Sequence, residues 1–190
     1  MLDKVSAWWY FSGKYMRKDF IAGVKNLWKW FPVIWKDRNW DQSFIYEILK
    51  TKIEFQAEYI GGRDIHTRAK HDASRMQLVA RLIERVKNGY YDAEYMDYHE
   101  SEMVFLDIED KPDFKELEMN IISEDFDSYL TKYPTWQKRA INYIKENQNR
   151  FTTDHNDKKL VAMIMGDLRQ EKAKELIFTI MSREIEGWWD

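Results

Sequence analysis

The sequence contains no cysteine, and this absence narrows the chemistry open to it. Without thiols the chain cannot form disulfides, bind metals through thiolates or use a cysteine nucleophile. At 190 residues the chain does not need disulfides or a bound metal for stability, because a chain of this length buries one sizeable hydrophobic core. We therefore expect a single domain over residues 1–190, in a chain compatible with a reducing cytosol.

Long apolar runs are also missing. No stretch approaches the roughly 20 apolar residues that cross a bilayer. The N-terminal MLDKVSAWWYFSGK lacks the basic, apolar and small-residue regions of a signal peptide. Neither secretion nor a membrane partner is expected, and the predicted location is the cytoplasm.

Glycine and proline are scarce, with 7 and 3 copies, and strand-like alternation is hard to find, so helices should dominate. The expected fold class is all-α, one compact domain of five or six helices. Apolar spacings of three and four residues predict a first long helix that Pro32 ends or kinks, then helices over about 42–60, 72–88, 134–148 and 154–187. The acidic segment 90–128 is less regular, with short helical pieces and an extended stretch at 103–108.

Two of these helices have a predicted buried face. On the helix over 72–88 the inward residues are Met76, Val79, Ile83 and Val86, with Gly89 closing the helix. On the helix over 42–60, which Asp41 is suited to cap, one side is lined by Phe44, Ile48, Phe55 and Tyr59.

The formal net charge of −3 conceals an uneven distribution. Residues 1–75 hold 14 Lys plus Arg against 9 Asp plus Glu, giving +5, whereas residues 92–128 hold 2 against 14, giving −12. A large acidic segment disfavours nucleic-acid binding, which needs a basic surface. The same segment is suited to imitate the charge of a nucleic acid, so inhibition of a host enzyme by protein–protein contact is one alternative function.

Catalytic motifs are weak. The four histidines are His66, His71, His99 and His155, and none forms the i, i+4 pair that places two metal ligands on one helical face. The dipeptide His71-Asp72 resembles the metal-binding pair of the HD phosphohydrolases, but the earlier histidine that their pattern needs on a separate helix is missing. No Gly-rich phosphate loop or nucleophile elbow is present.

Paired carboxylates keep one enzyme class open as an alternative. In helical nucleotide pyrophosphohydrolases, glutamates on facing helices hold magnesium between substrate phosphates. Here Glu54 and Glu58 lie one helical turn apart, and Glu94 and Asp97 form an E-x-x-D pair. The first pair departs from that family's E-x-x-E spacing, so a non-enzymatic role without metal or cofactor is preferred.

Cations gather in GGRDIHTRAKHDASR, residues 61–75, just before the third predicted helix. A helix N-terminus adds unpaired N–H groups and a positive dipole end, which favour an anion. Arg63, Arg68, Lys70 and Arg75 are therefore candidates to hold the phosphates of a small anionic ligand.

Aromatic residues gather in WKWFPVIWKDRNWD, residues 28–41. Most of these indoles are expected in the hydrophobic core or in a homo-oligomer interface, where tryptophan is enriched. Trp40 is the candidate to stack on a base, with Arg38 beside it to hold phosphate.

The string WFPVIWKDRNWD, followed by an amphipathic helix, resembles a family of small tailed-bacteriophage proteins with a similar aromatic stretch. The ending KAKELIFTIMSREIEGWWD is similar to that family's closing helix and Trp-Trp-Asp tail. The resemblance covers about residues 26–60, 72–100 and 170–190 and carries over no catalytic residue. It implies a phage protein in the cytoplasm of an infected bacterium. Together with the cations and indoles, it leads us to expect a protein that sequesters a nucleotide-type signal and so antagonises host defence.

Overall fold

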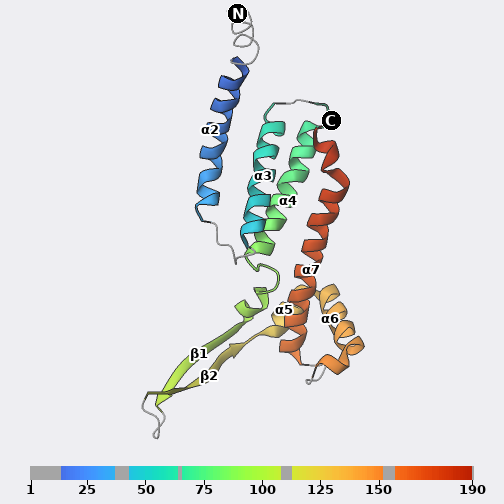
Figure 1. The fold of residues 1–190 in the computed structure, drawn as a ribbon. Coiled ribbons are helices and arrows are strands. Elements are labelled where there is room, and N and C mark those ends of the chain that lie inside the picture. The colour runs from blue at the N-terminus through green and yellow to red at the C-terminus, as the bar shows by residue number, and fades with distance from the viewer. Residues whose placement is uncertain (1–13, 37–42, 64–65, 108–112, 152–156, 190) are drawn as a thin grey trace, which may run out of the picture. The chain divides into compact units, whose positions relative to one another are not determined.

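The computed structural model describes residues 14–36, 43–63, 66–107, 113–151 and 157–189, apart from the side chains of Lys14 and Trp189. The chain forms two compact units, residues 1–49 and 50–190, and each is treated by itself. In order along the chain (Figure 1), the α-helices, 3-10 helices (η) and strands are α2 (Lys14–Ile34), α3 (Ser43–Gly61), α4 (Ala69–Lys87), η2 (Glu94–Tyr98), β1 (His99–Asp107), β2 (Lys115–Glu124), α5 (Phe126–Lys132), α6 (Pro134–Glu146), η3 (Gln148–Arg150), α7 (Lys158–Glu184) and η4 (Glu186–Trp189).

Helices dominate the described residues, as the scarcity of glycine and proline predicts, and six of them are α-helices. The prediction of a strictly all-α fold is wrong in one respect, because β1 and β2 form a two-stranded antiparallel sheet. The fold is therefore mainly α. The expectation of a single domain stays a prediction.

Helix α4 carries the best predicted core. Met76, Val79 and Ile83 are fully buried, as their spacing predicts. The helix begins three residues before the expected Asp72, and it closes at Gly89, whose φ of 64° lies in the left-handed region that glycine adopts freely.

Helix α3 buries a different face from the one predicted. Its buried side chains include Ile53, Ala57 and Ile60, whereas Ile48 and Tyr59 are exposed. The face of α3 that packs on α4 is set by the close approach of Gly61 to Ala73. A Cβ at Gly61 would stand 3.0 Å from the Cβ of Ala73. The apolar pattern of α3 alone did not contain that information. The predicted cap, Asp41, lies outside the described residues.

A second group of buried residues joins α5, α6 and α7. Pro134 occupies the first turn of α6, as predicted. Asp157 caps α7 by accepting hydrogen bonds from the backbone N–H groups of Lys159 and Leu160 at 2.9 and 3.2 Å. From there α7 runs for 27 residues and packs against both α6 and α4.

Strands β1 and β2 form a hairpin that we call the arm. In Figure 1 it leaves the end of η2 as a long ribbon and returns to α5. Met103 pairs with Met119 and Phe105 with Leu117, and a bulge at Glu100/Ser101 shifts the register near the base. The predicted extended stretch at 103–108 is confirmed as far as Asp107.

Helix α2 belongs to the first unit and has 21 residues. It continues through Pro32, the residue predicted to end or kink it, and ends two residues later at Ile34. Trp28 and Phe31 stack with ring centroids 6.4 Å apart, and both side chains are exposed. The expected burial of Trp28 in a hydrophobic core is therefore wrong for the described structure, and its burial in a homo-oligomer interface stays a prediction.

Candidate functional site

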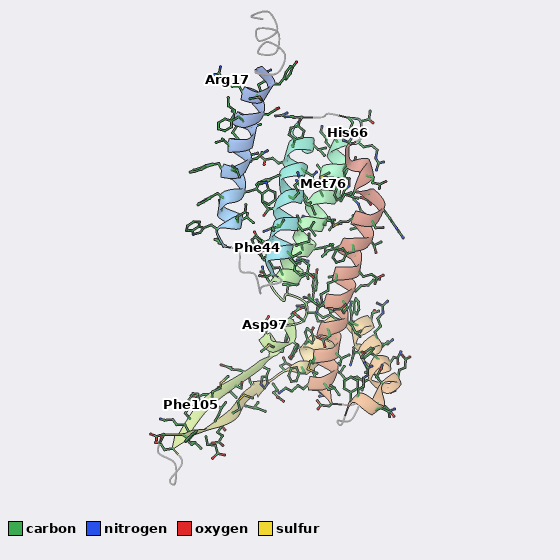
Figure 2. All side chains as sticks on the ribbon, in the orientation of Figure 1. Arg17, Phe44, His66, Met76, Asp97 and Phe105 are labelled. Atoms are coloured by element: carbon green, nitrogen blue, oxygen red, sulfur yellow. The ribbon has the colours of Figure 1, made fainter. Side chains whose placement is uncertain are left out.

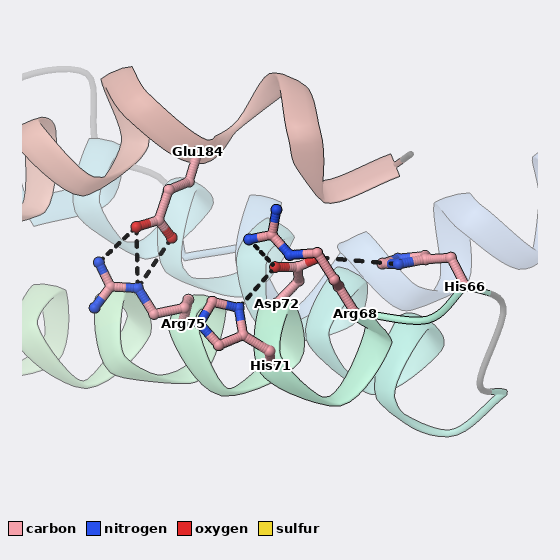
Figure 3. A network of polar contacts seen from close by, with 6 residues as sticks. All are labelled: His66, Arg68, His71, Asp72, Arg75 and Glu184. Carbon is pink, nitrogen blue, oxygen red and sulfur yellow. Dashed lines mark hydrogen bonds and ion pairs between the residues drawn. The ribbon is translucent and has the colours of Figure 1, made fainter.

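Two of the four cations predicted to form a cluster at the start of α4, Arg75 and Arg68, are paired with carboxylates. Figure 3 shows Arg75 facing Glu184 of α7, with Nε 3.1 and 3.0 Å from the two carboxylate oxygens and Nη2 2.6 Å from Oε1. The hydrogen bonds from Arg75 hold the pKa of Glu184 below its usual value. Arg75 therefore ties α4 to α7, and its charge is already matched.

Asp72 supplies the second carboxylate of this network (Figure 3). Its side chain is 2% exposed, and Oδ1 lies 3.4 Å from Nη2 of Arg68 and 3.0 Å from Nδ1 of His71. Oδ2 lies 3.9 Å from Nδ1 of His66. A carboxylate in the first turn also complements the positive end of the helix dipole. The chain thus places its own anion where the sequence suggested a bound one.

The other predicted ligand residues are not part of the network around Asp72 and Glu184. Arg63 stacks its guanidinium over the ring of Tyr59, 4.3 Å from the centroid. Lys70 is exposed on the first turn of α4, two residues from Arg68. Arg38 and Trp40 lie outside the described residues, so their pairing with this cluster stays a prediction.

A buried charge network around Glu94 was not found from the sequence. Arg169 of α7 donates from Nη1 to Oε2 of Glu94 at 2.6 Å and to the hydroxyl of Tyr129 at 3.0 Å. Lys132 and Tyr133 donate to Oε1 of Glu94 at 2.8 and 2.9 Å. Glu94 and Arg169 are 75 residues apart in sequence, so no local pattern could pair them.

The hydrogen bonds in this network decide the charge of Glu94. Burial favours the neutral acid, but the bonds from Lys132, Arg169 and Tyr133 outweigh it and hold the pKa of Glu94 below its usual value. Glu94, the first residue of η2, is thus an anion that accepts hydrogen bonds from Lys132 at the end of α5, from Tyr133 just after it and from Arg169 of α7. This contact set is typical of a structural ion pair.

That result weakens the magnesium alternative. Glu94 is surrounded by cations and hydroxyl donors, which does not suit a metal ligand. Glu54 and Glu58 are exposed on α3, and Asp97 is exposed on η2. Among the residues that the structure describes, no three His, Asp or Glu side chains lie close enough to hold a metal ion.

A groove of about 620 Å³ lies between α6 and α7. Trp136, Tyr143 and Leu168 are among the residues that line it, and its charged residues have both signs. Two of its cations are engaged, since Arg139 stacks 4.8 Å above Trp136 and Lys172 lies 2.7 Å from Glu175. Because the lining carries both positive and negative side chains, its charge favours neither an anionic nor a cationic ligand.

The arm has one apolar face, and that face is exposed. Because facing residues of paired strands point to the same side, the register places one set of apolar residues together. The apolar face of the arm consists of Met103, Phe105, Leu117, Met119 and Ile121, each 53% to 62% exposed. Figure 2 draws these strands with Phe105 labelled. The opposite face carries Glu102, Glu116 and Glu118 beside Val104 and Leu106.

Helix α2 carries a second exposed apolar surface. The apolar stripe of α2 consists of Phe20, Val24, Leu27 and Phe31, which recur at steps of three and four residues and are 49% to 73% exposed. The helix holds five Lys plus Arg against one Asp, giving +4, whereas β1 and β2 together hold six Asp plus Glu against one Lys, giving −5. The two surfaces are both apolar and opposite in charge.

No family model matches the chain, and comparisons with curated proteins and with solved structures gave no match. The resemblance to the phage family therefore stays a prediction. Within the part of the chain that the structure describes, no helix is long and apolar enough to cross a membrane.

Proposed function

We propose that the protein is an interaction protein that self-associates through the apolar face of the arm. The single observation that carries this proposal is the exposure of all five apolar side chains on that face. A two-stranded hairpin is marginally stable in water unless its apolar face packs against another element. Covering the exposed half of one such side chain contributes about 1 kcal/mol.

A second copy is the partner that the chain's own chemistry favours. A complementary surface needs apolar side chains beside positive charge, because the strands carry −5. Each copy of the chain offers such a surface in α2, with its exposed apolar stripe and +4. Self-association is also consistent with the aromatic residues of α2, since indoles and phenyl rings concentrate in interface cores.

Sedimentation velocity of the full chain tests this proposal. We expect the unmodified protein to sediment as a dimer or larger species, and the double variant Phe105→Ser, Leu117→Ser to shift to the monomer. Both side chains are exposed, so the substitutions should leave the helices intact.

Leu106→Ser is the matched control, because Leu106 lies on the opposite face of β1 and is 43% exposed. This variant should keep the mass of the unmodified protein. A monomeric unmodified protein at the highest concentration reached would overturn the proposal.

Binding of a nucleotide-type anion, with host defence as its setting, remains a second proposal. Arg68 favours it, because its side chain is 67% exposed at the residue before α4. The neutralisation of Arg75 by Glu184 weakens it. Calorimetry with cyclic and linear nucleotides is its test, and the absence of binding heat in the unmodified protein would remove it.

A further inference from the structure

We infer that α2 of a second copy lies along the apolar face of the arm, so that each copy covers the arm of the other. This inference rests on the proposed function, because it names the element that occupies a face already proposed to self-associate. It concerns a contact between two copies of the full chain.

The elements that carry the two surfaces match in length. An α-helix rises about 1.5 Å per residue, so the 21 residues of α2 span about 31 Å. A β-strand rises about 3.3 Å per residue, so the 9 and 10 residues of β1 and β2 span about 30 and 33 Å. One helix can therefore cover the whole arm without an overhang at either end.

They also match in pattern. The apolar face of the arm is one row of cross-strand pairs, with Met103 facing Met119 and Phe105 facing Leu117. A helix laid on such a row needs a stripe of apolar side chains at steps of three and four residues, which Phe20, Val24, Leu27 and Phe31 provide. Both surfaces hold large, flexible or aromatic side chains that pack closely without a polar group to satisfy.

The charges favour this pairing over contact between two arms. Arg17 lies three residues before Phe20, so its side chain flanks the apolar stripe of α2, whereas Lys18 and Lys25 lie toward the opposite side of the helix. The long side chain of Arg17 keeps its guanidinium in water while its stem covers apolar surface, so it can lie against the edge of the arm, whose two strands carry −5. Two arms placed face to face would instead bring −5 against −5.

Disulfide trapping between two single-cysteine variants tests the inference. Because the chain has no cysteine, every disulfide formed identifies the introduced pair. One full-length copy carries Val24→Cys in the middle of the α2 stripe, and a differently tagged copy carries Met119→Cys in the middle of the arm's apolar face. These side chains are 49% and 56% exposed, so both variants should fold.

The matched control replaces Met119→Cys by Glu118→Cys, which points to the opposite face of the arm. Under mild oxidation of the mixture we expect roughly tenfold more Val24Cys–Met119Cys disulfide between copies than Val24Cys–Glu118Cys disulfide, because contact raises the effective concentration of the two thiols.

Three results would overturn the inference, and they differ in whether self-association through the arm still holds. A disulfide that joins only two Met119Cys arms, in a protein that sediments as a dimer, would keep self-association through the arm and reject α2 as its partner. Control-level disulfide in every mixture, with a monomeric mass, would reject both. A chain carrying both cysteines that forms the disulfide within one monomer would also reject the exchange between copies.

Discussion

At the scale of single residues, the interior is organised by ion pairs between distant parts of the second unit. Glu94 and Arg169 are each 8% exposed and lie 2.6 Å apart. The guanidinium of Arg169 also contacts two aromatic rings, 3.9 Å from the centroid of Tyr133 and 5.5 Å from that of Tyr91. Removing one member of a buried pair leaves the other charged and poorly solvated, which costs more than the pair itself contributes.

The variant Arg169→Ala should therefore lower the free energy of unfolding by about 3 kcal/mol, the lower end of the range for such pairs, because Lys132 and Tyr133 still hold Glu94. Urea denaturation followed by circular dichroism measures the change.

The matched control is Arg183→Ala on the same helix, where Arg183 is exposed. It should change the free energy of unfolding by no more than about 0.5 kcal/mol. If Arg169→Ala and Arg183→Ala unfold at the same urea concentration, the buried pair does not stabilise the unit in the way described.

Sequence reasoning identified cations and carboxylates but not their pairing. Arg75 was predicted to hold a ligand, yet its partner Glu184 is 109 residues away in sequence. Spacing along a helix predicts neighbours three or four residues apart, and contacts between separate helices depend on how they pack. For that reason the pairing of Arg75 with Glu184 and the network of Glu94 were both missed.

At the scale of elements, the helices with strong apolar periodicity were predictable and the arm only in part. α4 followed its pattern because a helix packed on one side shows a clear stripe. The arm was harder to predict because its apolar face is exposed and its strands lie in an acidic segment. Its signal was the alternation of Glu116, Leu117, Glu118 and Met119, a period of two over few residues.

Helix α3 shows that the spacing of large apolar residues does not always identify the buried face of a helix. Large side chains such as Tyr59 were expected inside, whereas small Ala57 is buried. The close approach of α3 and α4 near Gly61 favours small residues on the contact side. Large apolar side chains therefore do not identify the buried side of α3 at this contact.

At the scale of the whole molecule, two exposed apolar surfaces of opposite charge are the features that the fold does not explain. Among the described residues no three His, Asp or Glu side chains are grouped to hold a metal ion, and the groove between α6 and α7 is lined by charges of both signs. The exposed apolar side chains of the arm and of α2 are typical of a protein that buries such surfaces by binding a partner. Association of two copies should therefore increase the protection of the backbone amides of both elements against hydrogen exchange.

Hydrogen–deuterium exchange of the unmodified full chain at low and high protein concentration tests this claim most directly. Association should slow exchange in β1 and β2, and in α2 if that helix is the partner, while α4, whose apolar residues are already buried, exchanges at the same rate at both concentrations. Exchange in the arm that is equally fast at both concentrations would contradict self-association through its apolar face.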